Sequence, residues 1–223
     1  MGILFVIAIH CIMIGMLGVV VAALAALITL IFSKKESRKK NIWTAIISPF
    51  IGLYTMYVCG FIGSCIVSSI KNVDIGTGDF WYVPLTNNCR LSFIDVPDQA
   101  YIENDERQII SDVVQLQQID NKIFGKTFNN KYFFYNTSTS ELMEFNTEKE
   151  LITLNSGAKL QLMNSMRFYS ERRDEVAGFA TIVVVVISFL CGIMGIYFAR
   201  KMIVQIVSVI DPRQAREIIE ANY

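Results

Sequence analysis

Histidine is almost absent from this chain of 223 residues, in which His10 is the only one. Zinc sites draw on closely spaced histidine, cysteine and carboxylate ligands, so the usual zinc constellations cannot be assembled here. The chain also has no nucleophile elbow, no phosphate-binding glycine loop and no HExxH motif. We therefore expect a protein that is not an enzyme and that holds no metal or cofactor.

Cysteine is scarce outside apolar sequence, and a concentrated basic surface is missing as well. Four of the five cysteines lie within long apolar runs, which leaves Cys89 alone in the more polar middle of the chain. One thiol cannot build a disulfide framework. Residues 71–175 carry 11 basic and 16 acidic side chains. Because nucleic acid binding needs a concentrated basic face, nucleic acid is not an expected partner.

Charged residues are absent from three long stretches, residues 3–32, 42–70 and 176–199. About 20 apolar residues suffice to cross a hydrocarbon core roughly 30 Å thick. The first stretch is longer than the apolar part of a secretory signal peptide, and no basic segment precedes it. The sequence therefore predicts an α-helical membrane protein with three transmembrane helices, whose first partner is the lipid bilayer.

The basic residues predict which way the helices cross. Residues 33–41 hold five cations against the single acidic Glu36, and Arg200 and Lys201 follow the third stretch. Short loops rich in lysine and arginine stay in the cytoplasm. We expect the N-terminus and residues 71–175 on the extracytoplasmic side, and residues 33–41 and the C-terminus in the cytoplasm. The expected location is a cell membrane, which the chain crosses several times.

The middle of the chain has the pattern of a small, mainly β domain inserted between the second and third helices, over residues 71–158. Its apolar residues are interrupted every two to four positions by polar residues and turn formers, which is typical of short strands. Asn129 and Asn130 predict a hairpin with a two-residue primed turn, in which both residues adopt positive φ. The expected strands are residues 80–85, 90–96, 113–119, 122–128, 131–135 and 141–145.

Helical signals follow the strands. Thr147 with Glu150 three residues later has the form of a capping box. No proline occurs in residues 159–201, which we expect to form a helical stalk and the third transmembrane helix. Asp211 and Pro212 resemble a helix start, so residues 202–223 are expected to form a helical cytoplasmic tail.

Residues 122–151 read KIFGKTFNNKYFFYNTSTSELMEFNTEKEL. With a glycine in a strand, an aromatic run and an N-T-x-T-x-E turn, this stretch is similar to small β domains of uncharacterised exported or membrane-anchored bacterial proteins. The resemblance implies a bacterial source, and with it a bacterial inner membrane as the location, and it assigns no functional residues.

Small residues form stripes along the three apolar stretches. Since lipid supplies little hydrophobic drive between helices, small residues allow the close backbone approach that packs them. The candidate packing residues are Gly15, Gly18, Ala22, Ala26, Gly60, Ser64, Gly192 and Gly195. They favour packing among the three helices, with docking onto other membrane proteins or self-association as the alternative.

Two groups in the middle segment invite a functional interpretation. Asp79, Trp81 and Tyr82 combine a carboxylate with aromatic faces and form a possible recognition surface, although the same residues suit a first core strand. The second group is an acidic stretch without the spacing of a calcium loop, so we expect a solvated loop. It comprises Asp95, Asp98, Glu103, Asp105 and Glu106.

Together these patterns predict a non-catalytic accessory subunit or sensor that presents a small extracytoplasmic recognition domain within a membrane complex. Two alternatives stay open. One is a membrane immunity or defence protein that binds an incoming toxin, and the other is an oligomeric channel or transporter subunit.

Overall fold

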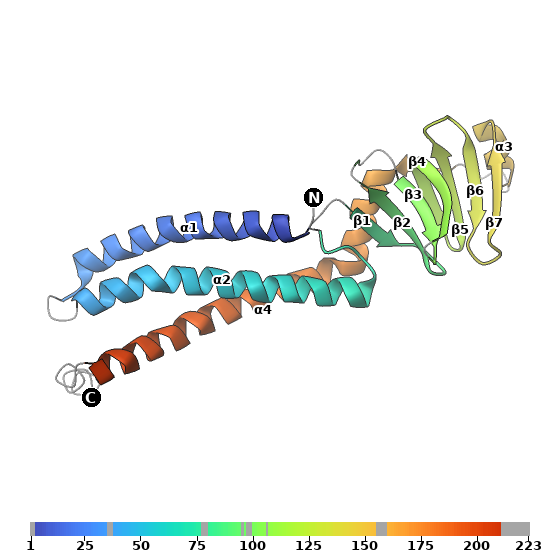
Figure 1. Ribbon diagram of the computed structural model, residues 1–223. Helices are drawn as coiled ribbons and strands as arrows, with labels where there is room; N and C mark the ends of the chain where they lie inside the picture. Colours follow the sequence, from blue (N-terminus) through green and yellow to red (C-terminus); the bar gives the residue numbers. More distant parts are fainter. Residues whose placement is uncertain are drawn as a thin grey trace. The chain divides into compact units, whose positions relative to one another are not determined.

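The computed structural model describes residues 3–34, 38–76, 80–94, 96, 100–105, 107–154 and 160–210 (Figure 1). The chain forms two compact units. One contains Ser64–Thr181, and the other contains Leu4–Gly63 together with the residues from Ile182 onward. Asp79, Asp95, Asp98, Glu106 and the predicted tail helix from Asp211 lie outside the described residues.

Three long helices account for the apolar stretches: α1 (Ile3–Phe32), α2 (Arg38–Lys71) and α4 (Ser165–Ile210). Each is long and apolar enough to cross a membrane, and a separate antiparallel sheet lies between α2 and α4 in the chain. The predicted combination of three such helices with a β domain is therefore confirmed.

The helices bury little of their apolar surface. Within the most apolar 18-residue stretch of each helix, only 11% of the residues in α1, 6% in α2 and 11% in α4 are buried. Leu4, Phe179 and Phe32 are about four-fifths exposed. Soluble proteins rarely expose contiguous apolar surface on this scale. Helices of this kind suit a hydrocarbon environment, in which an α-helix satisfies its own backbone hydrogen bonds.

The sheet is an antiparallel meander whose seven longer strands lie side by side in chain order (Figure 1). A short eighth strand, β8 (Met163–Asn164), pairs with β4. The seven are β1 (Phe80–Pro84), β2 (Cys89–Ile94), β3 (Ala100–Asn104), β4 (Arg107–Ile119), β5 (Lys122–Thr127), β6 (Tyr132–Asn136) and β7 (Glu141–Phe145).

Strand β4 is long enough to pair with two other strands along one of its edges. Its first part pairs with β3, and Gln115 and Leu116 further along pair with β8. The register shifts near Asp112, which has a φ of 56°. Such bulges bend a strand and increase the local twist, so they favour a curved sheet.

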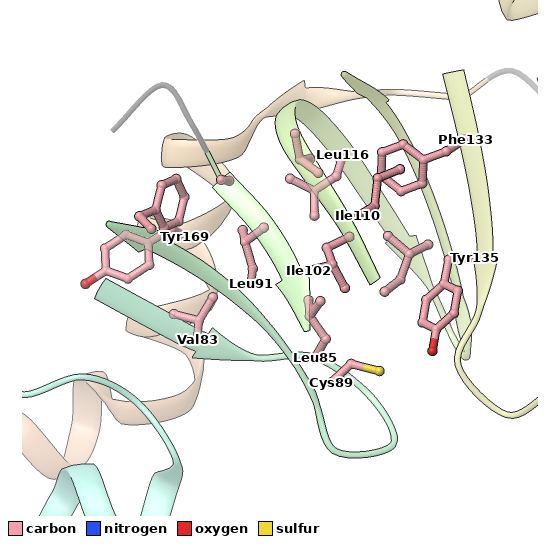
Figure 2. Close-up of a cluster of buried hydrophobic side chains, with 14 residues drawn as sticks. Val83, Leu85, Cys89, Leu91, Ile102, Ile110, Leu116, Phe133, Tyr135 and Tyr169 are labelled. Carbon is pink, nitrogen blue, oxygen red and sulfur yellow. The ribbon is translucent and has the colours of Figure 1, made fainter. Parts of the chain in front are cut away.

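The curved sheet encloses a cluster of buried apolar side chains on its concave face (Figure 2). We call this cluster the main core; it includes Val83, Leu91, Ile102, Leu116 and Phe133. The turn after β1 meets the turn after β6, where Asn87 Nδ2 donates to the hydroxyl oxygens of Thr137 at 2.9 Å and Ser138 at 3.0 Å.

A second cluster of buried side chains lies on the opposite side of the sheet. Because side chains alternate along a strand, Phe133 faces the main core while Phe134 faces this second cluster. There α3 (Glu148–Leu154) contributes the buried Leu151.

The predicted hairpin is confirmed, but its turn differs. Only Asn130, with a φ of 59°, adopts the left-handed conformation, and its N–H donates to the Thr127 carbonyl at 3.0 Å. The Thr127 N–H in turn donates to the Lys131 carbonyl at 2.9 Å. This is a three-residue turn that ends in a bulge, for which one left-handed residue is enough.

The capping box is confirmed. The Glu150 carboxylate accepts from the Thr147 N–H at 3.3 Å, and the Thr147 hydroxyl accepts from the Glu150 N–H at 3.4 Å. The final helix begins later than expected, at Ser165 rather than residue 159. Asn164 caps it by accepting from the N–H of Met166 at 2.9 Å.

The acidic stretch is not a uniform solvated loop, so that prediction is wrong for Glu103. Glu103 lies on β3, a strand that the sequence pattern did not predict, and its side chain is buried, with the residue only 7% exposed. The apolar residues of β3 that face the core are just Ala100 and Ile102. Because polar Gln99 and charged Glu103 flank these two positions, the alternation was too short to indicate a strand.

The β domain also extends beyond residue 158. Phe168 and Tyr169 on the first turns of α4 pack into the main core, where the Tyr169 ring meets Phe93 edge-on at 5.6 Å between centroids. The start of α4 is therefore part of the domain, and the sequence-based boundary at 158/159 divides the core.

Candidate functional site

Trp81 and Tyr82 lie on opposite faces of β1, as neighbouring residues in a strand must. Trp81 packs against the main core, whereas Tyr82 lies on the outer face beside Phe80 at 5.4 Å between ring centroids. The two aromatic residues therefore do not share one surface.

The outer face of β1–β3 carries an ion pair in which Glu103 is buried and Arg90 is half-buried. The Glu103 carboxylate accepts from Arg90 Nε at 2.6 Å and from the Ser92 hydroxyl at 2.7 Å. The Arg90 guanidinium in turn lies 5.4 Å from the centre of the Tyr82 ring, which is a cation–π contact. Burial, and then the negative charge of Glu103, raises the pKa of Tyr101 on the same face.

This arrangement suits recognition better than acid–base chemistry. Both charges are already paired, and apolar Phe80 and Ile94 beside them are 41 and 53% exposed. An aromatic and apolar surface with a fixed polar centre is typical of protein interaction sites. We name Phe80, Tyr82, Arg90, Ile94 and Tyr101 the outer aromatic face.

A second polar cluster joins the segment after α2 to the start of α4, and we name it the Asp74 junction. The Asp74 carboxylate accepts from the Tyr169 hydroxyl at 2.6 Å and from the Gly76 N–H at 2.7 Å. Arg173 Nε lies 3.9 Å from it. Asp74 is 5% exposed and Tyr169 is 6% exposed. A buried carboxylate is stabilised only when donors surround it, so the junction couples these segments.

The junction also covers the edge of the sheet. The Asp74 N–H donates to the Tyr82 carbonyl at 3.2 Å, and Arg172 Nε donates to the Pro84 carbonyl at 3.2 Å. These carbonyls belong to β1, the edge strand, whose free backbone groups would otherwise invite pairing with another chain. The segments leading to and from the apolar helices thus complete the domain.

The sequence pattern did not predict the Asp74 junction, although it contains one turn motif that belongs to it. Asp74 and Gly76 form an Asx-type turn, and Gly76 has a φ of 75°. A Cβ atom at Gly76 would lie 2.7 Å from Arg173 Nη2. The Asp-x-Gly pattern could have predicted the turn, but not its partner Tyr169, which lies 95 positions along the chain.

The five glycines among the predicted small residues lie at contacts between helices of one unit. A Cβ at Gly18 would lie 2.8 Å from the Phe50 ring, and one at Gly192 would lie 3.1 Å from the Gly52 carbonyl oxygen. Comparable contacts join Gly15 to Tyr54, Gly60 to Ser188, and Gly195 to Thr55. Ala22 is buried, whereas Ala26 and Ser64 are half-buried. Within this unit α2 therefore contacts both α1 and α4.

His10 also packs against α2. Its Nδ1 lies 3.3 Å from the Tyr57 hydroxyl, and the two rings meet edge-on at 5.8 Å. The neighbouring Tyr54 hydroxyl donates to the Cys11 carbonyl at 2.9 Å. Polar groups of the two helices thus satisfy one another, as expected where water is excluded.

In the part of the chain that the structure describes, no three histidine, cysteine or acidic side chains come together as metal ligands. Comparison of the chain with models of protein families, with curated proteins and with solved structures finds no match.

Proposed function

We propose that this protein is a non-catalytic, multi-pass membrane protein that presents its β domain outside the cytoplasm, as a sensor or accessory subunit of a membrane complex. The observation that carries the proposal is the continuity of α4. This single helix of 46 residues contributes Tyr169 to the domain core and then continues as an apolar segment long enough to cross a bilayer.

The Asp74 junction supports a coupling role. The segment that leaves α2 and the helix that becomes the third apolar span meet at one buried carboxylate. A change in the domain that displaces Tyr169 therefore acts on both segments that join the β domain to the apolar helices, the one after α2 and the start of α4. An α-helix transmits such a displacement because its backbone is hydrogen-bonded along its whole length.

The basic residues support the orientation, and the outer aromatic face supports recognition. Arg38 and Lys40 lie in the first turn of α2, and Arg200 follows the apolar part of α4. By the positive-inside rule we infer that these ends lie in the cytoplasm and the β domain outside. A bacterial inner membrane is the location that the resemblance of residues 122–151 implies. The outer aromatic face then offers the surface for another membrane protein.

The test is affinity purification of the full chain in mild detergent, followed by mass spectrometry. We expect a stoichiometric partner that is recovered with wild type and with Asp120→Asn, an exposed control. We expect lower recovery with Asp74→Asn, which removes the buried charge but keeps the side-chain shape.

Two outcomes would contradict the proposal. A homo-oligomer without a partner would favour a channel. A lone monomer would favour an immunity protein that meets its target only on attack.

A further inference from the structure

A polar pocket of about 560 Å³ lies at one end of the curved sheet, between the turn that joins β3 to β4 and strands β6 and β7. Its lining includes Asn104, Asp105, Arg107, Tyr135 and Leu142. This volume lies in the range of sites for small molecules. None of these residues belongs to the outer aromatic face or to the Asp74 junction.

Two buried polar atoms in this lining have no nitrogen or oxygen hydrogen-bond partner, namely the Tyr135 hydroxyl and Asn104 Oδ1. Tyr135 is only 1% exposed. The Cys89 thiol lies beside this hydroxyl at the same end of the core and is a hydrogen-bond neighbour of it, but a thiol is a weak partner (Figure 2). Most buried polar atoms in proteins have a strong partner, so two atoms in one pocket without one point to a ligand that pairs with them.

The strand register explains why these atoms come together. Asn104 is paired with Cys89, at the end of β3 on the core face, and Tyr135 is paired with Leu142 across β6 and β7. The curvature of the sheet then brings β3 and β6 to the same pocket. Strand pairing thus fixes the position of Tyr135, and its hydroxyl can pair with a ligand in the pocket.

Among the described residues of the rim, Asp105 is acidic and Arg107 is basic. Asp105 and Arg107 are both exposed and flank the same turn, and neither forms an ion pair with another described residue. Ile109 and Leu142 supply an apolar wall. A matching ligand therefore has a cationic donor, an anionic acceptor and a small apolar group.

We propose that this pocket binds a small zwitterion of the α-amino acid class. Its ammonium group donates to the Asp105 carboxylate and to Asn104 Oδ1. Its carboxylate accepts from Arg107 and from the Tyr135 hydroxyl, while its side chain contacts Ile109 and Leu142. The inference goes beyond the proposed function and does not depend on it, because it concerns binding by the protein alone.

The test is calorimetric titration of the full chain in detergent with L-alanine, L-valine and L-leucine. N-acetyl-L-leucine lacks the ammonium group, and L-leucine methyl ester lacks the carboxylate. We expect at least one free amino acid to bind, and each blocked form of leucine to bind about tenfold more weakly than leucine or not at all.

Tyr135→Phe separates binding from folding. Because it removes only a buried hydroxyl whose one protein neighbour is a weakly bonding thiol, we expect a melting temperature close to wild type or higher, with about tenfold weaker binding. Arg107→Gln should weaken binding similarly, whereas Arg167→Gln, an exposed arginine outside the pocket, should leave it unchanged.

Absence of binding by all three amino acids at about 10 mM, well above the dissociation constants of specific sites, would overturn the inference. Equal binding of the blocked forms, or wild-type affinity in Tyr135→Phe, would overturn it as well. None of these results bears on whether a protein partner co-purifies.

Discussion

At the scale of single residues, the β domain depends on positions where only one side-chain size fits. Gly125 on β5 is paired with Phe133 on β6, whose ring lies over the glycine. A Cβ atom there would collide with this ring and would lie 2.8 Å from the Gln115 carbonyl oxygen. The ring can turn, but the backbone oxygen belongs to the neighbouring strand and cannot move away.

We therefore expect Gly125→Ala to destabilise the domain by about 1–3 kcal/mol, the usual cost of overpacking a core. The measurement is the melting temperature of the purified protein in detergent, followed by tryptophan fluorescence. Gly178→Ala is the matched control, because a Cβ there meets only Asp174 at 4.0 Å. Equal melting temperatures for the two variants would show that the Phe133 ring and β4 adapt without cost.

A second prediction at this scale concerns pH. Burial raises the pKa of the Cys89 thiol above its ordinary value. Above about pH 8.5 the unfolded chain loses this proton while the folded domain keeps it, so stability falls as pH rises through that window. The loss is at most about 1.4 kcal/mol per pH unit for one group.

Melting temperatures measured between pH 7 and 10 should therefore decline, and Cys89→Ala should make the decline shallower. Cys65→Ala is the control, because Cys65 is exposed. An identical slope for Cys89→Ala and wild type would mean that the thiol does not contribute.

At the scale of elements, α2 holds the helices of its unit together, and its contact with α1 depends on small side chains. Ala22 is 4% exposed although it lies on a helix whose other faces are open. We expect Ala22→Leu to force the helices apart, at a cost of about 1–3 kcal/mol. Ala23→Leu adds the same atoms to an exposed position and should have little effect.

Yield and melting temperature in detergent measure this difference. If Ala22→Leu matches Ala23→Leu in both, the contact does not stabilise the unit.

At the scale of the whole molecule, the predicted orientation rests on five cations after the first apolar stretch. In a variant without native cysteines, a cysteine at Ser37 should be shielded from an impermeant thiol reagent in intact cells. A cysteine at the exposed Thr139 should be labelled. Labelling at position 37 with none at 139 would reverse the orientation.

The domain boundary gives the second prediction at this scale. A fragment of residues 73–175 retains Tyr169 and the Asp74 junction, whereas a fragment of residues 73–164 loses both. Loss of a buried aromatic residue costs about 3–5 kcal/mol, comparable to the whole stability of a small domain. We expect the longer fragment to show a mainly β circular dichroism spectrum with a cooperative melt, and the shorter one to melt at a markedly lower temperature. Equal melting temperatures would show that α4 is dispensable for the domain.

The sequence alone determined the features that depend on local patterns: the three apolar helices, the hairpin of residues 122–128 and 131–135, and the capping box at Thr147. Apolar length and cap chemistry are properties of neighbouring residues, so they can be read along the chain. Tertiary structure decided the burial of Glu103, the partners of Asp74 and the pocket around Tyr135. These depend on strand register and sheet curvature, which bring together residues far apart in the sequence and which no local pattern encodes.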